Sequence, residues 1–249
     1  MLLGLDVGNT DTVMGLFKGS ILFFHKRIPS LNLKYFLKKK TFLNHVDFAI
    51  VSSVVPSLDP LIRKMLHSLK IKKVTFVTHR MSLPILLKVD RPGDVGADRI
   101  VNNSSAFVSY GGPLLVIDLG TATTIDYIDS KGAYRGGVII PGLKISAHAL
   151  FERAAKLRYV ILSAEGAKDL FQLPPKILGV NTVSQMQSGI VQGYVAMVDG
   201  MIAKIQKEIK KKPKIIITGG LGFLISPHLS FKNTLDPFLT LRGLELLSR

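Results

Sequence analysis

Met1-Leu-Leu-Gly-Leu-Asp-Val-Gly-Asn-Thr10 opens this chain, and a similar stretch, Leu114-Leu-Val-Ile-Asp-Leu-Gly-Thr121, follows later. Aligned on the acidic residue, Asp6 falls on Asp118 and Gly8 falls on Gly120, an offset of 112 residues. In both copies an apolar run is followed by a carboxylate and then by a glycine. This pattern indicates that the chain is internally duplicated.

Each copy predicts a buried strand that ends in a tight turn, with the carboxylate near the end of the strand. Gly8 and Gly120 lack a Cβ atom, so the turn can tighten and its backbone amides can approach a ligand. Neutral side chains that can hydrogen-bond follow: Asn9, Thr10, Thr121, Thr123 and Thr124. Neutral donors beside an acidic residue suit a phosphate group that is bound together with its cation.

Both copies continue into a predicted hairpin. After the first turn, strands at residues 12–17 and 21–27 flank Lys18-Gly19-Ser20, which is a hairpin signal. After the second turn, strands at residues 123–128 and 134–140 flank Asp129-Ser-Lys-Gly132. Two three-stranded meanders with the same turn chemistry support the duplication.

The remaining segments alternate between predicted helices and strands, which favours an α/β fold with helices covering the sheets. Apolar spacing and Gly/Pro signals predict helices at residues 31–40, 57–69, 96–110, 143–156 and 183–209, and strands at residues 48–52, 74–78 and 214–218. Gly111-Gly112-Pro113 ends the third helix. We therefore expect two domains, 1–112 and 113–249.

Composition excludes several classes of site. The 249 residues are 47% hydrophobic, which is enough for substantial cores, and they contain no cysteine, which excludes disulfides and thiolate metal sites. The six histidines show no ligand spacing. No apolar run reaches the roughly 18 residues of a membrane span, so we expect no signal peptide or membrane anchor, and a cytoplasmic location is compatible.

The formal net charge is +16, from 33 basic and 17 acidic residues. Such a charge is compatible with nucleic-acid binding, with anionic substrates or with solvated lysines. The basic clusters at residues 38–40, 70–73 and 207–214 lie near expected element ends and have no interleaved aromatic residues. We therefore favour exposed helix ends, where cations suit the helix dipole, over nucleic-acid binding.

The longest predicted helix, 183–209, has a wide apolar face. Gly189 and Gly193 are four residues apart and could let another helix approach closely. Two interpretations stay open for this helix, a homodimer contact and ordinary core packing.

Common nucleotide-binding and nucleophile motifs are absent from the sequence, namely the Gly-x-x-x-x-Gly-Lys loop, the Gly-x-Gly-x-x-Gly turn and the Gly-x-Ser-x-Gly elbow. If the protein binds a nucleotide, it therefore uses a different phosphate-binding loop. Two facing strand turns would bring carboxylates to a cleft between two domains, where acidic residues hold hydrated Mg²⁺ or a monovalent cation and backbone amides hold phosphate.

A duplicated Asp-x-Gly strand turn resembles that of the acetate and sugar kinase, chaperone ATPase and actin superfamily, which implies two ribonuclease-H-like domains with a cleft between them. Six further matches occur in order over nearly the whole chain: Asp6-Val-Gly-Asn-Thr10, Gly96-Ala-Asp-Arg99 with Asn102, Asp118-Leu-Gly-Thr-Ala-Thr-Thr-Ile-Asp126, Gly136-Gly-Val-Ile-Ile-Pro-Gly142, Asn181-Thr182 with Met186-Gln-Ser-Gly189, and Thr218-Gly-Gly220. Together they closely resemble type III pantothenate kinase.

The resemblance implies transfer of the γ-phosphoryl group of ATP, with Mg²⁺, to the primary hydroxyl of pantothenate, the first step toward coenzyme A. It implies that ATP contacts Thr121 and the first loop, which comprises Asp6, Val7, Gly8, Asn9, Thr10, Asp11, Thr12 and Val13. It implies a potassium or ammonium ion at Asp118. The substrate contacts it implies are Gly96, Ala97, Asp98, Arg99 and Thr182, with Asp98 as the proton acceptor.

These roles agree with the chemistry of the side chains. Phosphoryl transfer depends mostly on positioning and charge neutralisation, and a carboxylate such as Asp98 can accept the hydroxyl proton. The guanidinium of Arg99 matches the pantothenate carboxylate. A simple Asp98–Arg99 surface pair is the alternative. For Asp126, a place in the cation network and a strand cap are both open.

Three residues depart from the family pattern: Val89, Arg158 and Gln185. Val89 replaces an aromatic hydroxyl residue, which could loosen one wall of the pantothenate site. Two other functions are weighed against the kinase assignment. One is a sugar or polyol kinase of the same superfamily, and the other is a non-catalytic nucleotide- or nucleic-acid-binding regulator, which the charge encourages.

Overall fold

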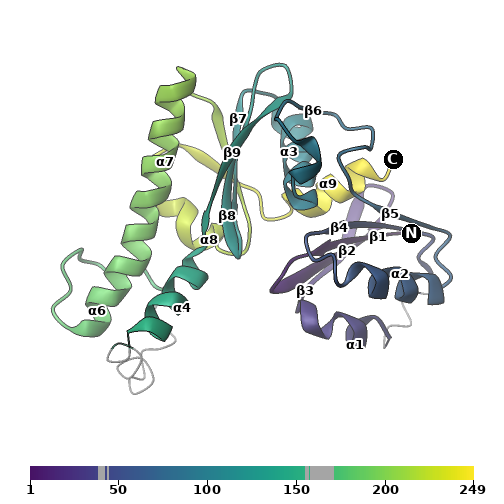
Figure 1. The fold of residues 1–249 in the computed structure, drawn as a ribbon, viewed down its shortest axis with the longest axis horizontal. Coiled ribbons are helices and arrows are strands. Elements are labelled where there is room, and N and C mark those ends of the chain that lie inside the picture. Colours follow the sequence, from purple (N-terminus) through teal and green to yellow (C-terminus); the bar gives the residue numbers. More distant parts are fainter. Residues whose placement is uncertain (39–42, 44, 155–156, 158–170) are drawn as a thin grey trace. The chain divides into compact units, whose positions relative to one another are not determined.

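A computed structural model of the protein describes residues 1–38, 43, 45–154, 157 and 171–249. The chain forms two compact units (Figure 1). Unit 1 comprises Met1–Val116, Asp126–Gly136 and Phe238–Arg249, and unit 2 comprises Ile117–Ile125 and Gly137–Pro237. The domain boundary at residues 112 and 113 stays a prediction from the sequence.

The first sheet has the strand order β3-β2-β1-β4-β5. Its strands are β1 (Leu2–Val7), β2 (Asp11–Lys18), β3 (Ile21–Pro29), β4 (Phe48–Ser53) and β5 (Lys73–Phe76). The first three form an antiparallel meander, whereas β4 lies parallel to β1 and β5 lies parallel to β4. The predicted meander and the two later strands are confirmed. Gly19 makes the β2–β3 turn with φ +58°, a conformation that glycine adopts without strain.

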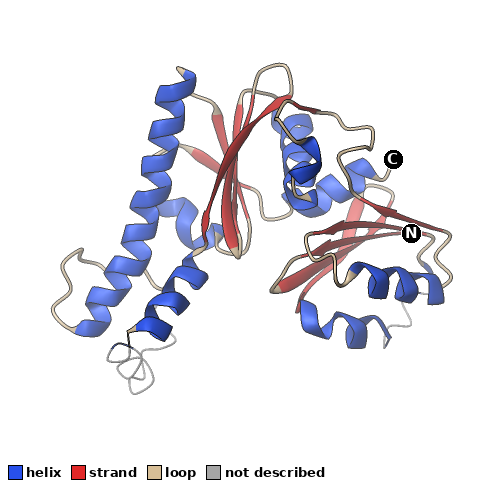
Figure 2. Ribbon diagram, in the orientation of Figure 1, coloured by secondary structure: helices blue, strands red, loops and turns tan. Residues whose placement is uncertain are grey.

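Helices cover both faces of this sheet (Figure 2). They are α1 (Leu33–Lys38), α2 (Asp59–Ser68), α3 (Ala97–Tyr110) and α9 (Leu239–Leu247), with short 3₁₀ turns at Ser30–Asn32 and Pro92–Asp94. One core joins α1 and α2 to Leu3 and Leu5 of β1. A second core joins α3 and α9 to Phe17 and Ile50. The predicted helices 57–69 and 96–110 are confirmed.

Helix α9 was not expected from the sequence. It packs against α3 and against strands β1, β2 and β4 (Figure 1). The approach is close, because a Cβ atom at Gly243 would lie 2.6 Å from the carbonyl oxygen of Val101. The last twelve residues of the chain thus complete the core of unit 1.

The second sheet has the order β11-β10-β7-β8-β9-β6. Its strands are β6 (Leu86–Leu87), β7 (Leu114–Leu119), β8 (Ala122–Ile128), β9 (Ala133–Pro141), β10 (Lys214–Thr218) and β11 (Asn233–Leu235). Without β6, the order β9-β8-β7-β10-β11 repeats β3-β2-β1-β4-β5 element by element. The duplication predicted from the two strand turns is therefore confirmed in the topology.

The helices of unit 2 include one long helical run. Helix α6 (Thr182–Gln187) continues through a π-helical turn (Ser188–Gln192) into α7 (Gly193–Ile209), which confirms the predicted helix 183–209. Among the described residues of this unit, further helices are α4 (Leu143–Arg153) and α8 (Gly222–Ile225), and a 3₁₀ turn at Ser226–His228 follows α8. The expected ends of the helices 31–40 and 143–156 lie outside the described residues.

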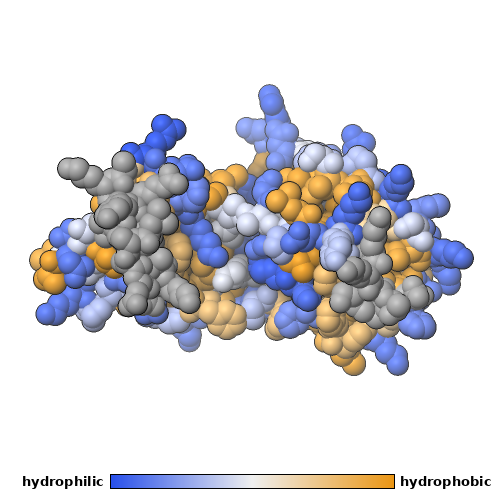
Figure 3. Space-filling view, turned by 90° about the horizontal axis from the view of Figure 1, so that it is seen from below, coloured by the Kyte–Doolittle hydropathy of each residue, from blue (hydrophilic) through white to orange (hydrophobic). Residues whose placement is uncertain are grey.

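The surface carries many of the charges. Lys207, Lys210, Lys211, Lys212 and Lys214 are exposed at the end of α7 and just beyond it, as expected for solvated helix ends. On the face drawn in Figure 3, hydrophilic residues are interspersed with exposed hydrophobic ones. Among the residues that the structure describes, no helix is both long enough and apolar enough to cross a membrane.

Candidate active site

The carboxylate of Asp6 lies near the end of β1, next to Ser52 on the parallel strand β4. Asp6 and Ser52 are register partners, and the Ser52 hydroxyl donates a hydrogen bond of 3.0 Å to Asp6 Oδ1. Burial, together with the negative charge of Asp98, raises the pKa of Asp6 from 3.8 to about 7. The carboxylate of Asp98 is therefore close enough to influence the ionisation of Asp6.

The turn after Asp6 is held by hydrogen bonds from its own backbone and from hydroxyl groups. The amide of Gly8 donates to the carbonyl oxygen of Asp11 at 3.0 Å. Ser30 Oγ donates to the carbonyl oxygen of Gly8 at 2.6 Å and lies 2.9 Å from Thr12 Oγ1. A Cβ atom at Gly8 would lie only 2.9 Å from the Asp11 carbonyl oxygen. The turn thus needs glycine at this position.

The residues of the predicted first ATP loop differ in exposure. Asn9 and Thr10 are exposed at the tip of the turn, whereas Val7 and Thr12 are buried. The carboxylate of Asp11 forms an ion pair of 3.4 Å with Arg27. The exposed tip is therefore the part of the turn that can meet a ligand with both backbone and side-chain donors.

The segment Gly96 to Arg99 forms the start of α3. Asp98 lies in the first helical turn, where the helix dipole favours a negative charge, and its Oδ1 accepts a hydrogen bond of 2.7 Å from the Arg99 amide. A Cβ atom at Gly96 would collide with that same oxygen. Burial raises the pKa of Asp98, although the Arg99 amide and guanidinium oppose the shift.

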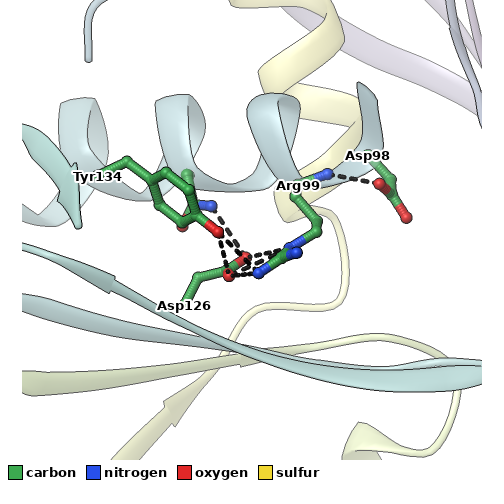
Figure 4. A network of polar contacts seen from close by, with 5 residues as sticks. Asp98, Arg99, Asp126 and Tyr134 are labelled. Carbon is green, nitrogen blue, oxygen red and sulfur yellow. Dashed lines mark hydrogen bonds and ion pairs between the residues drawn. The ribbon is translucent and has the colours of Figure 1, made fainter. Parts of the chain in front are cut away.

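The side chain of Arg99 points away from Asp98 and binds Asp126 of β8 (Figure 4). Its Nε donates to Asp126 Oδ1 at 3.1 Å and to Oδ2 at 3.2 Å, and its Nη2 donates to Oδ1. Nη2 also donates to the hydroxyl of Tyr134 at 2.7 Å, and that hydroxyl donates to Asp126 Oδ1 at 3.1 Å. Asn103 Nδ2 donates to Asp126 Oδ2 at 3.0 Å.

This network is almost entirely removed from water. The side chain of Arg99 is 13% exposed and that of Asp126 is 2% exposed. The pKa of Arg99 is raised, since the hydrogen bond and charge of Asp126 outweigh the opposing effect of burial. The pKa of Tyr134 is raised by burial and by the nearby Asp126. Neither interpretation of Asp126 from the sequence, cation network or strand cap, anticipates this ion pair.

The second strand turn has different neighbours. Gly219, with φ +92°, approaches the carboxylate of Asp118 so closely that a Cβ atom there would collide with Oδ1 and with the Leu119 backbone. Gly142 donates its amide to the carbonyl oxygen of Thr121 at 3.1 Å. The hydroxyls of Thr123 and Tyr194 hydrogen-bond to each other, which ties β8 to the long helical run.

The chemistry around Asp118 fits a potassium or ammonium ion. These cations prefer oxygen ligands, and Asp118 offers a carboxylate beside a backbone that glycines keep free of side chains. No cluster of three or more His, Asp or Glu side chains suited to a metal occurs in the described part of the chain. The side-chain oxygen that this turn offers to such a cation is that of Asp118.

A cavity of about 640 Å³ lies in unit 2 beside the helical run. Thr182, the predicted substrate contact, lines it together with Gln185, Gly189, Gly193 and Tyr194. Gln185, one of the three departures, donates from Nε2 to the carbonyl oxygen of Gly179 at 3.3 Å. Of the other departures, Val89 is partly buried, and Arg158 lies outside the described residues.

Within unit 1 the predicted residues Asp6 and Asp98 come together, and within unit 2 Asp118 and Thr121 share one turn. Sequence reasoning missed the polar groups that hold these residues. Ser30 and Ser52 stabilise the first turn and its carboxylate, and Tyr134 joins the Arg99 ion pair. The register of β1 with β4 is the signal that pairs Ser52 with Asp6.

Solved structures share the fold at low sequence identity. The ethanolamine utilization protein EutJ from Carboxydothermus hydrogenoformans matches with a TM-score of 0.58 and 14% identity, over 98% of this chain and 89% of its own. The activator of 2-hydroxyisocaproyl-CoA dehydratase from Clostridium difficile, solved with bound ADPNP, matches with a TM-score of 0.54 and 12% identity, over 99% and 92%. These likenesses support the expected fold class.

Sequence comparison is more specific. The family model described as type III pantothenate kinase matches residues 2–204. Relatives named type III pantothenate kinase, from Geobacillus thermodenitrificans and Geobacillus sp. strain WCH70, are each 41% identical over 258 aligned positions, which cover 99% of this chain and 96% of theirs. This chain therefore belongs to the type III pantothenate kinase family.

Proposed function

We propose that this protein transfers the γ-phosphoryl group of ATP to the primary hydroxyl of pantothenate, forming 4′-phosphopantothenate and ADP in the first step of coenzyme A biosynthesis. The main support for this proposal is the partly buried carboxylate of Asp98, which lies at the start of α3 and near Asp6. The match of the family model to residues 2–204 supports the same function. A carboxylate at this position can accept the proton of the acceptor hydroxyl.

In the proposed reaction, the hydroxyl oxygen of pantothenate forms a bond to the γ-phosphorus while the bond from that phosphorus to the β,γ-bridging oxygen breaks. The electron pair of the broken bond leaves with ADP, and the hydroxyl proton goes to Asp98. Burial raises the pKa of Asp98, so its ionised form is a stronger proton acceptor than an exposed aspartate. If the transition state is loose, the reaction does not require a stronger base than this carboxylate.

Substrate binding follows the roles that the family resemblance implies. Gly96, Ala97, Asp98, Arg99 and Thr182 contact pantothenate, and Asp6 to Val13 with Thr121 contact ATP. The location of Thr182 on the wall of a 640 Å³ cavity supports its part in binding. The exposed tip of the first turn supports a phosphate contact by backbone amides.

Cations complete the proposed site. Asp118 would hold the potassium or ammonium ion beside the glycine backbone, and Mg²⁺ would be bound together with the phosphates of ATP. When bound, such ions neutralise phosphate charge. The protein itself contributes the carboxylate of Asp118 and the backbone of Gly219, which lies close to that carboxylate.

A homodimer in the cytoplasm is the proposed state of the protein. The apolar residues Ile177, Leu178 and Val180 are 64%, 84% and 91% exposed next to the helical run, which supports a contact with a second copy. Sedimentation that detects only monomer at working concentrations would exclude the dimer.

The decisive experiment measures ADP release and phosphopantothenate formation by the purified protein. We expect both products with ATP, Mg²⁺, K⁺ and pantothenate, and lower rates when Na⁺ replaces K⁺. A panel of sugars and polyols should give no comparable rate. Turnover of a sugar but not of pantothenate would contradict the proposal, as would salt-dependent DNA binding without any kinase activity.

A further inference from the structure

The geometry points to Asp126 as a positioning residue that holds the guanidinium of Arg99 in place for the carboxylate of the substrate. This inference rests on the proposed function, because it assumes that Arg99 binds the pantothenate carboxylate. It adds a residue to which the sequence motifs give no such role. The ion pair, its burial and the hydrogen bonds around it carry the argument.

Asp126 cannot itself reach a substrate. Its side chain is 2% exposed, and both oxygens accept hydrogen bonds: Oδ1 from Arg99 and Tyr134, and Oδ2 from Arg99 and Asn103 (Figure 4). These donors use most of the lone pairs of the carboxylate. Asp126 therefore acts through the groups that bind it.

Arg99 is held along one edge only. Nε and Nη2 donate to Asp126, and Nη2 also donates to Tyr134. Within the described residues, Nη1 has no hydrogen-bond partner, so its two N–H groups are free to donate to a carboxylate. A guanidinium is rigid and planar, so fixing the Nε–Nη2 edge also fixes the direction of Nη1.

The support extends beyond the ion pair. Arg99 and Asn103 are one helical turn apart on α3, so the helix presents both donors to Asp126. Tyr134 comes from β9, next to β8, and its hydroxyl joins Arg99 to Asp126. Each donor of the network thus comes from a regular element, which limits the freedom of Arg99 before any substrate binds.

The same hairpin offers a matched control. Asp129 follows β8 and binds Arg135 of β9 with a hydrogen bond of 2.8 Å from Nε, but the side chain of Arg135 is 52% exposed. The two aspartates are three residues apart, and the arginine is far more exposed in the second pair than in the first. Only the buried pair includes a residue of the Gly96–Arg99 segment.

The test compares pantothenate with its neutral carboxamide analogue in wild type, Asp126→Asn and Asp129→Asn. Asparagine keeps the shape of Asp126 but turns N–H donors toward Arg99. We expect Asp126→Asn to lower kcat/KM for pantothenate about tenfold or more, mainly through KM. The kcat/KM for the carboxamide and the KM for ATP should each change by less than about threefold, which is within ordinary mutant scatter. Asp129→Asn should retain the wild-type preference.

The outcomes separate this inference from the proposed function. Wild type that phosphorylates neither compound overturns both. If wild type is active but Asp126→Asn lowers kcat/KM equally for both compounds, only the positioning role is overturned. In an Arg99→Gln background, Asp126→Asn should no longer change the preference, because the two residues act as one unit. A further change in preference there would contradict the inference.

If Asp126→Asn does not fold, Tyr134→Phe provides the same test, since it removes one hydrogen bond from Arg99 and leaves the ion pair. We expect a KM for pantothenate raised about tenfold, and a KM for the carboxamide that changes by less than about threefold. An unchanged KM for pantothenate, or an equal rise for both compounds, would overturn the inference.

Discussion

The two Asp-x-Gly strand turns share a sequence pattern and a position in the fold but differ in what surrounds the carboxylate. Asp6 and Asp118 each lie near the end of a strand whose two neighbours correspond in the two sheets. Serine hydroxyls and a second carboxylate accompany the first turn. In the second turn, the backbone of Gly219 lies close to the carboxylate of Asp118.

This difference supports the different roles that we propose for the two equivalent positions. A carboxylate beside another carboxylate has a raised pKa and suits proton transfer and phosphate positioning. A carboxylate that the backbone of a glycine approaches closely, as at Asp118, is the arrangement that we propose for an oxygen-ligated cation. Duplication therefore supplied the strand turn twice, and the residues that pack on each copy determine what the copy can do.

The largest effect in the first turn's surroundings is expected from Asp98→Ala. Removal of the proposed proton acceptor should lower kcat about 10³-fold, a typical contribution of general acid–base catalysis. Folding should be retained, because the change removes a partly buried charge next to Asp6. Steady-state kinetics together with circular dichroism measure both effects.

Asp94→Ala is the matched control for this variant. Asp94 is exposed and lies four residues before Asp98, so its loss should leave kcat close to the wild-type value. Full turnover in Asp98→Ala would remove Asp98 as the base and end the proposed difference between the two turns.

The second turn should respond most to Gly219→Ala. Alanine at φ +92° is strained, and its Cβ atom would collide with the Asp118 carboxylate and the Leu119 backbone. We expect a loss of about 3 kcal/mol in the free energy of unfolding. The activation by K⁺ over Na⁺ should weaken as well. Denaturant unfolding and rates in both salts measure these effects.

Gly200→Ala separates this effect from a general response to alanine. A Cβ atom at Gly200 of α7 meets no heavy atom within 4 Å, so the variant should be neutral or more stable by up to about 1 kcal/mol. Equal stability of the Gly219 and Gly200 variants would show that the second turn does not depend on bare backbone.

Local sequence patterns were sufficient to predict most of the fold. The two meanders, the helix at 96–110 and the long helical run follow from hydrophobic periodicity and from turn residues, which act over a few positions. Strands β6 and β11, of two and three residues, are too short for such a pattern. Helix α9 is defined by its packing on α3 and on the first sheet, far away in sequence.

The site was predictable where a motif was local, and not where the partner was distant. Gly96 to Arg99 and the two strand turns are continuous in sequence. The partner of Arg99 is 27 residues away, and that of Asp6, Ser52, is 46 residues away. Sequence alone offers several acidic partners for Arg99, and only the packing of α3 against β8 and β9 selects Asp126.

The smallest effect in this comparison concerns the ionisation of Asp6 and is measured through stability. Burial and the charge of Asp98 raise the pKa of Asp6 in the folded protein from 3.8 to about 7. The folded state therefore binds this proton more tightly than the unfolded state. Its stabilising contribution is full below about pH 4 and decreases as the pH rises toward 7.

Asp6→Asn should remove this dependence, because asparagine does not ionise. Between pH 5.5 and 7.5 we expect the wild-type free energy of unfolding to fall more than that of the variant, by at most about 2 kcal/mol. Urea unfolding at several pH values measures the difference, with Asp90→Asn, which removes an exposed carboxylate, as the control. Parallel profiles for wild type and Asp6→Asn would mean that water or a bound cation already compensates the charge of Asp6. The first turn would then resemble the second in its electrostatics, and only its hydroxyl groups would distinguish it.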